Sequence, residues 1–173
     1  YGVEYTKAQI DEENDGTRTF AVREADINGH GTHVAGTAAG SGLALNKYTG
    51  VAPQADIIVV KGGDGSFSEA RMIDGLAYAQ NKAAALGKPI VVNWSIGGQS
   101  GPHDGTRAYE LAINSFVSTP GRVVCVAAGN DGANLIHLGG SISSGGSGSV
   151  TVAVPAYTAI SGSNNDRFIV EIW

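Results

Sequence analysis

NGHGTHVAGTAAG, residues 28–40, is the stretch on which the fold of this chain depends. His30 and His33 stand three residues apart at the head of a run of small residues. On a helix, residues at this spacing occupy neighbouring positions of one face. The stretch therefore predicts a helix from about Gly31 to Gly42 that carries two imidazoles close together near its start.

His30 is a candidate general base. Gly29 and Gly31 flank it and leave a bare backbone through which a bulky substrate can approach. The positive end of a helix dipole disfavours a charged imidazole, so a neutral ring that accepts a proton is favoured there. Two other interpretations stay open: a capping or packing histidine, and a zinc site shared with His33, although the third ligand and the carboxylate of an HExxH motif are missing.

Strand-like and helix-like segments alternate along the following residues. Continuous apolar, β-branched runs suit strands buried in a parallel sheet, and apolar stripes at helical spacing suit helices that cover it. Ser66 and Glu69 fit a capping box, and Gly87 with Pro89 reads as a helix stop. The expected elements are a strand at 57–60, a helix at 67–86, a strand within 89–94, a helix at 104–118 capped by Asp104, and a strand at 122–127.

Glycines and polar residues follow each expected strand. They are Gly63–Phe67 after the first, Ser95–Gly98 after the second and Asn130 after the third. Taken by themselves, these segments read as ordinary Gly-rich turns. In a parallel sheet, however, ligands bind at the carboxyl ends of the strands, which is where all three segments would lie.

Three separate stretches, in this order, resemble the subtilisin-like serine proteases, the subtilases. They are NGHGTHVAGT from residue 28, the region from GVAP at residue 50 to WSIGG at residue 94, and AAGN at residues 127–130. The resemblance covers roughly residues 28–132. It implies an α/β fold: a three-layer subtilisin-like core with a mainly parallel sheet flanked by helices, plus a short C-terminal β segment.

The resemblance also implies a role for each matching residue. His30 would be the catalytic base, with His33 a structural neighbour, and Asn130 would donate a hydrogen bond to the oxyanion. A polypeptide substrate would pair with Ser95, Ile96 and Gly97 as an added strand. The remaining substrate-binding residues would be Gly98, at the specificity pocket, and Gly65 and Ser66, in one wall of the groove.

Two parts of the family's pattern are missing from this sequence. Asp15-Gly16-Thr17 has no preceding apolar strand, Asp26 is too close to His30, and no Gly-Thr-Ser-Met-Ala-like segment follows Asn130. We therefore expect an internal segment of a serine endopeptidase, inactive by itself, whose partner is the rest of the parent catalytic domain. The rival hypothesis is a non-catalytic subtilase-like module that binds peptides or proteins.

Composition limits the other classes of function. The formal net charge of −5 and a pI near 5.2 argue against a nucleic-acid partner, and no apolar run is long enough to predict a membrane span. Cys125, within RVVCVAA, reads as a buried strand residue. No cofactor or metal is expected, because the Leu43–Thr49 loop lacks the carboxylates of a calcium loop. Secretion or a cell-envelope location is implied by the resemblance alone.

The ends of the chain differ from its middle. The acidic run at residues 11–15 reads as a solvated loop, and Thr19–Arg23 fits a short strand before the histidine motif. The sequence divides into a partial catalytic domain at 1–140, a Gly/Ser linker at 141–149 and a β-strand segment at 150–173. Two strands are rarely stable alone, so the last segment is expected to begin an inserted β-sandwich.

Overall fold

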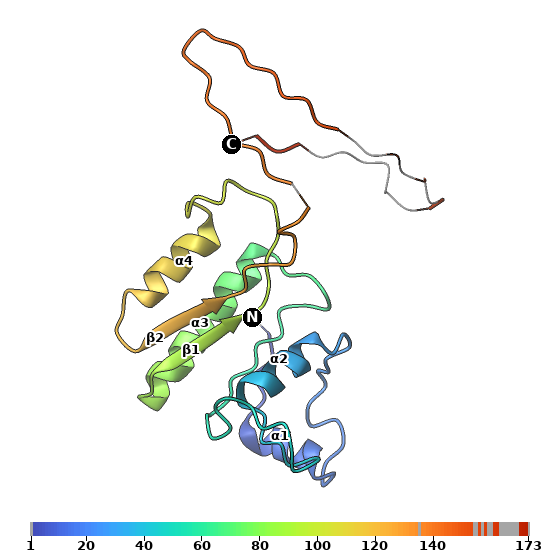
Figure 1. The fold of residues 1–173 in the computed structure, drawn as a ribbon. Helices are drawn as coiled ribbons and strands as arrows, with labels where there is room; N and C mark the ends of the chain where they lie inside the picture. The colour runs from blue at the N-terminus through green and yellow to red at the C-terminus, as the bar shows by residue number, and fades with distance from the viewer. Residues whose placement is uncertain are drawn as a thin grey trace.

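The computed structural model describes residues 2–134, 136–153, 156, 158, 161–162 and 170–172. In chain order its elements are α1 (Lys7–Asn14), α2 (His30–Ala39), α3 (Glu69–Leu86), β1 (Ile90–Trp94), α4 (Ala108–Val117) and β2 (Arg122–Val126). Helix and strand alternate from α3 onward (Figure 1), so the α/β class expected from the sequence is confirmed.

The two strands β1 and β2 are hydrogen-bonded neighbours and run parallel. Their register pairs Ile90 with Arg122 and Trp94 with Val126. Both strands are rich in β-branched residues, which fit the pleated surface of a sheet. Because the strands are parallel and in register, the loops that follow them leave the sheet at the same edge.

The core lies between this sheet and the helices α3 and α4, which contact each other and cover the same face. Leu76, Trp94 and Phe116 are buried there, and Phe116 is 1% exposed. Alternate side chains of a strand point to opposite faces, so Ile90, Val92 and Trp94 all point into this core. Each helix contributes one apolar stripe, and these two stripes cover the core.

The two ends of α3 differ in how well the sequence predicted them. Gly87 has φ +61, a left-handed conformation that glycine adopts without steric cost, and it ends the helix as expected. The helix begins two residues later than expected, because Ser68 and not Ser66 is the cap: its hydroxyl accepts from the Arg71 N–H. The Ser66–Glu69 capping box was wrong.

The start of α4 also differs from the expectation. Asp104 does not cap it, because the Asp104 carboxylate already accepts from the Thr106 N–H at 3.0 Å and from the Thr106 hydroxyl at 2.6 Å. The cap position is Arg107, whose N–H donates to the Glu110 carboxylate at 2.9 Å. The helix therefore starts at Ala108.

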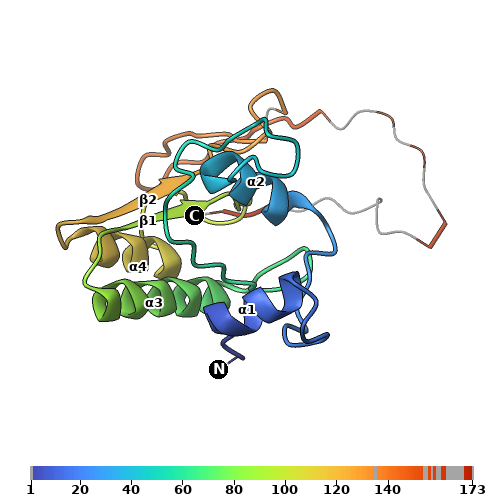
Figure 2. The ribbon, with the colours of Figure 1, turned by 90° about the horizontal axis from the view of Figure 1, so that it is seen from below.

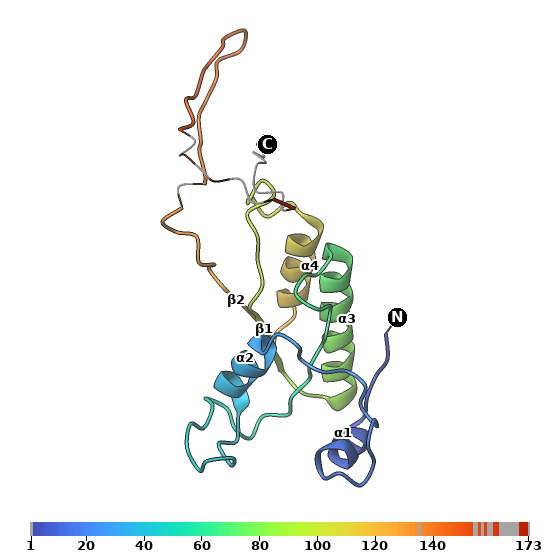
Figure 3. The same ribbon diagram turned by 90° about the vertical axis from the view of Figure 1, so that its right-hand side faces the viewer.

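The second face of the sheet is open. Val91 and Val123, paired across the strands, are 69% and 49% exposed. Cys125 is exposed on this same face, so its expected burial was wrong: the alternation of the strand turns it away from α3 and α4. Figures 2 and 3 show α2 on this side of the sheet, apart from the strands, so the described elements form two packed layers and the third layer stays a prediction.

The strand expected at Ile57–Val60 is absent from the described residues. This segment makes no backbone ladder, and Ile57 and Val59 are exposed. Val60 lies against α3, where a Cβ added at Gly75 would be 3.1 Å from its side chain. A strand forms only where a neighbouring backbone satisfies its N–H and C=O groups, and the described residues provide none here.

The N-terminal region also corrects the sequence analysis. Part of the acidic run lies in α1, because Thr6 and Gln9 form a reciprocal capping box that starts a helix. Lys7 and Asp11, one turn apart, form an ion pair on its surface. The expected strand at Thr19–Arg23 is absent, and residues 19–22 form turns and bends.

The division into domains near the C-terminus stays a prediction. The predicted β-strand segment falls largely on residues 154–155, 157, 159–160, 163–169 and 173, which lie outside the described residues. Residues 141–149 form neither helix nor strand. The described residues near the end return to the loop after β1, where Glu171 accepts from the Ser100 hydroxyl and the Gly101 N–H, both at 3.0 Å. No helix among the described residues is long and apolar enough to cross a membrane.

The accessible surface is large for a chain of this mass. It measures 13816 Å², whereas a compact monomer of 17.6 kDa exposes about 7,900 Å². The extended residues that follow β2 (Figure 1), the open sheet face and the exposed apolar run near residue 59 all contribute to this excess. The described core is therefore small and leaves apolar surface that other polypeptide could cover.

We predict that Phe116→Ala lowers the free energy of unfolding by about 3 to 5 kcal/mol, because it leaves a cavity in a small core. Leu111 lies on the same helix and is 55% exposed, so Leu111→Ala should lower the free energy of unfolding by less than about 1 kcal/mol. Urea unfolding followed by circular dichroism measures both. Equal losses in the two variants would show that the core does not hold α4.

Candidate active site

The loops that follow β1 and β2 lie at one edge of the sheet. Ser95–Gly98 follows β1 directly, and Asn130 lies four residues beyond β2. The Ala127 N–H donates to the Trp94 carbonyl at 3.1 Å, which continues the pairing past the strand ends. The parallel sheet therefore brings these two sequence-predicted segments to the same edge.

His30 is the first residue of α2. Gly29 precedes it with φ +84, a left-handed conformation suited to glycine, and this turns the chain sharply into the helix. The His30 side chain is exposed, and its ring has no hydrogen bond or ion pair within the described part of the chain. The ring nitrogens are thus accessible to a substrate or to another side chain.

Asp26 holds the start of α2, a role that the sequence analysis missed. Its carboxylate accepts from the backbone N–H groups of Asn28, Gly29 and Thr32 at 3.1, 2.8 and 2.8 Å, and from the Thr32 hydroxyl at 2.8 Å. These bonds satisfy N–H groups that a helix start otherwise leaves unpaired. An aspartate just before Asn-Gly and a helix pattern was the available signal.

The same hydrogen bonds perturb the acidity of Asp26. The Thr32 N–H and hydroxyl, followed by the Gly29 N–H, hold the pKa of this carboxyl well below its usual range. The carboxylate therefore stays charged at the positive end of the helix dipole, where a negative charge is favoured.

Lys61 connects the residues before α2 with the loop that was predicted to form one wall of the substrate groove. Its ammonium group donates to the Ala25 carbonyl at 2.7 Å and pairs with Asp64 at 2.6 Å and Glu24 at 3.6 Å. The Asp64 carboxylate, more than any other group, raises the pKa of Lys61. Gly65 and Ser66 follow Asp64, so this lysine links the start of their loop to the residues that precede Asp26.

The GVAP segment packs on the far end of α2. Three N–H groups of the segment donate to carbonyls at the end of the helix, including Gly50 to Gly40 at 2.8 Å and Val51 to Thr37 at 3.2 Å. A Cβ added at Gly50 would lie 2.5 Å from the Gly40 nitrogen, so only glycine allows this approach. The glycine of GVAP thus fixes the loop that follows the histidine helix.

The segment Ser95–Gly98 presents unpaired backbone. No backbone–backbone hydrogen bond to these residues occurs within the described ranges. Gly97 and Gly98 are exposed, and a Cβ added at either would meet no atom within 4 Å. Asn93 donates to the Ser95 hydroxyl at 2.9 Å and steadies the start of the segment. An extended peptide could pair with this backbone as an additional strand.

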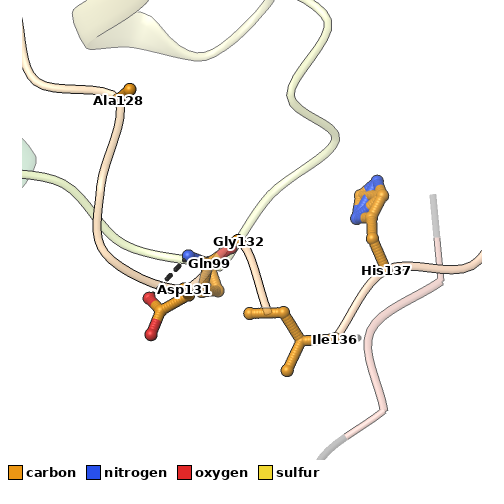
Figure 4. Close-up of a pocket in the computed structure, with 6 residues that line it drawn as sticks. All are labelled: Gln99, Ala128, Asp131, Gly132, Ile136 and His137. Atoms are coloured by element: carbon orange, nitrogen blue, oxygen red, sulfur yellow. Dashed lines mark hydrogen bonds between the residues drawn. The ribbon is translucent and has the colours of Figure 1, made fainter. Parts of the chain in front are cut away.

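A pocket of about 380 Å³ lies beside this segment (Figure 4). Gln99 donates to the Asp131 carboxylate at 2.9 Å across the pocket, and Asn134 donates to the other Asp131 oxygen at 2.8 Å. Sequence reasoning missed these residues, although they directly follow Gly98 and Asn130. The pocket is lined by Gln99, Ala128, Asp131, Gly132, Ile136 and His137.

The family model that describes the subtilase family matches residues 3–167 of this chain. The chain belongs to the subtilase family. The protease Pen c 1 of Penicillium citrinum is 36% identical over 152 residues, which cover 86% of this chain and 34% of that protein. The subtilase-type proteinase psp3 of Schizosaccharomyces pombe is 40% identical over 112 residues, or 62% of this chain and 22% of that protein.

A solved structure supports the same family. The CspB protease of Clostridium perfringens superposes with a TM-score of 0.71 at 35% identity, over 76% of this chain and 29% of that one. The subtilase chain described here therefore has a subtilisin-like fold, and it spans about a fifth to a third of the curated relatives it matches. The relatives also include the major intracellular serine protease of Bacillus subtilis, so secretion stays a prediction.

Within this subtilase chain, the predicted site residues form two groups. Lys61 joins Ala25, five residues before His30, to Asp64, which precedes Gly65 and Ser66, while the β1–β2 pairing brings Ser95–Gly98 near Asn130. No hydrogen bond joins His30 to Asn130 in the described residues. No group of three or more metal-ligating side chains occurs there either.

We predict that Asp26→Ala speeds amide exchange at Thr32 and His33 by roughly five- to tenfold, because the helix start loses its acceptor. Asp15→Ala is the control: its carboxylate caps a turn at Thr17, outside α2, so these amides should be unaffected. Hydrogen exchange followed by NMR measures both. Unchanged protection in Asp26→Ala would contradict the assigned role.

The same bonds predict a pH dependence for α2. Because the folded-state pKa of Asp26 lies below the ordinary value of about 3.9, its contribution is present above that value. The contribution is lost as the pH falls from the ordinary pKa through the lower, folded-state pKa. Acid titration should therefore lower the hydrogen-exchange protection of the Thr32 amide in the unsubstituted protein but not in Asp26→Ala. The same pH profile in both proteins would contradict this prediction.

Proposed function

We propose that this chain supplies the general base and the oxyanion donor of a serine endopeptidase. The observation that carries the proposal is the exposed His30 ring at the first position of a helix whose start Asp26 fixes, in a chain that belongs to the subtilases. The serine and the aspartate of the triad would come from polypeptide beyond these 173 residues. No cofactor is needed for this chemistry.

In the proposed reaction the serine hydroxyl attacks the peptide carbonyl while His30 takes its proton. The tetrahedral intermediate collapses to an acyl-enzyme, and His30 gives the proton to the leaving amine. Water then attacks the acyl group by the same route and regenerates the serine. The Asn130 side chain would donate to the oxyanion in both steps, and the aspartate would orient the His30 ring.

The substrate would be an extended polypeptide. The unpaired backbone of Ser95, Ile96 and Gly97 supports its binding as an added strand, because main-chain hydrogen bonds give affinity that does not depend on sequence. Gly98 leads into the pocket beside Asp131, which would receive one substrate side chain. Gly65 and Ser66 would form the opposite wall.

The chain by itself is proposed to be inactive and to dock against the rest of a catalytic domain. Its accessible surface exceeds that of a compact monomer by thousands of Å², and Val91 and Val123 are exposed on the open sheet face. Apolar side chains gathered on one face of a sheet are normally covered in folded proteins. Covering it would also bring the missing serine and aspartate to His30.

The same geometry supports a second candidate, a subtilase-like module that binds peptides without cleaving them. The added-strand site at Ser95–Gly98 needs no nucleophile to hold a peptide. The two hypotheses differ in one respect: the module would lack the serine throughout the protein that carries this chain. An assay of peptide hydrolysis by that protein separates them.

We predict that His30→Ala abolishes measurable peptide hydrolysis in the protein that carries this chain, because the serine loses its base. Asn130→Ala should lower kcat by roughly a hundred- to a thousandfold, which is the effect of removing the equivalent oxyanion donor from a subtilisin, a member of the same family. Steady-state kinetics on a peptide substrate measures both.

His33→Ala, one turn further along α2, is the control and should retain activity within a few-fold of the unsubstituted protein. Loss of activity in His33→Ala together with full activity in His30→Ala would exchange the roles of the two histidines. Full activity in Asn130→Ala would remove the oxyanion assignment.

A further inference from the structure

His103 and His137 come together from loops that follow different strands. Their ring centroids are 5.5 Å apart and the ring planes cross at 84°. His103 lies in the loop after β1, and His137 lies beyond β2 and lines the pocket of Figure 4. Both side chains are exposed, so neither ring is held there by burial in the core.

We propose that these two histidines form a binding site for a divalent transition-metal ion, with zinc as the type case. Zinc binds imidazole nitrogen at about 2.0 to 2.1 Å with tetrahedral geometry, which places the centroids of two coordinating rings roughly 5 Å apart. The observed separation matches this spacing. Imidazole also suits copper and nickel, whereas calcium and magnesium prefer oxygen ligands.

The surrounding hydrogen bonds hold the two loops in place. The Gln99 side chain donates to Asp131 at 2.9 Å and joins the loop after β1 to the loop after β2. The Gln99 carbonyl lies 3.0 Å from Nε2 of His103, a contact that suits an Nε2–H donor and leaves Nδ1 unprotonated and able to coordinate an ion. These bonds therefore hold the His103 ring and connect the two loops before any ion binds.

The site provides two protein ligands, and the remaining positions would be filled by water or a further ligand. Nearby carboxylates are already engaged: Asp104 accepts from Thr106, and Asp131 accepts from Gln99 and Asn134. This agrees with the absence of a three-ligand cluster in the described residues. Since His137 lines the pocket, a bound ion would sit at the pocket rim.

The test uses the full 173-residue chain, which contains four histidines. Zinc chloride is titrated in while the imidazole signals are followed by NMR and the heat by calorimetry. We expect saturable binding of one ion that shifts the signals of His103 and His137, and no such shift with calcium chloride. No saturable zinc binding, or shifts confined to His30 and His33, would overturn the proposal.

Variants provide the second readout. His103→Gly and His137→Gln should each weaken zinc binding by more than about tenfold. Combining them should add little, because both would remove the same site. Residue 103 has φ +53, so glycine fits its backbone without strain. The matched control is His30→Gln with His33→Gln, the second histidine pair of the chain, which should leave the affinity unchanged. Unchanged affinity in both loop variants would contradict the assignment.

Discussion

The parallel pairing of β1 with β2 is the constraint on which the rest of this structure depends. Because the register pairs Ile90 with Arg122 and Trp94 with Val126, the segments that leave the strands do so side by side. One face of the pair closes on α3 and α4 around Phe116. The unpaired backbone at Ser95–Gly98, the loop of Asn130 and the His103–His137 pair all follow from that geometry.

The pairing also explains why apolar side chains on the second face of the sheet stay exposed. Two strands and the helices on one face bury a small core, and the valines on the other face stay exposed. The histidine helix α2 lies on that open side and depends on local contacts: the Asp26 carboxylate at its start, the GVAP backbone at its end and Lys61 at its approach. The His30 end is thus ordered by bonds within its own segment and its neighbours, whereas the surface between α2 and the sheet is where we propose that further polypeptide docks.

Local signals in the sequence predicted much of this fold, and long-range ones did not. The strands β1 and β2 and the end of α3 at Gly87 depend on residue pattern and backbone conformation within a few residues, and they were confirmed. The strand at Ile57–Val60 depends on a partner that the described residues do not supply, and the burial of Cys125 depends on what covers the second face. Motifs placed His30 at a helix start, and the capping by Asp26 is a local contact within residues 26–32. The pocket, in contrast, arises from contacts between separate loops.

The central claim is that His30 serves a serine that lies beyond these 173 residues. Intact-mass measurement after treatment with a fluorophosphonate, which labels activated serines, tests it most directly. We expect no adduct on the 173-residue chain and one adduct on the longer protein that carries it, located on a serine outside residues 1–173. A protein without an adduct would contradict the protease assignment and favour the peptide-binding module, and an adduct within residues 1–173 would contradict the division of the triad.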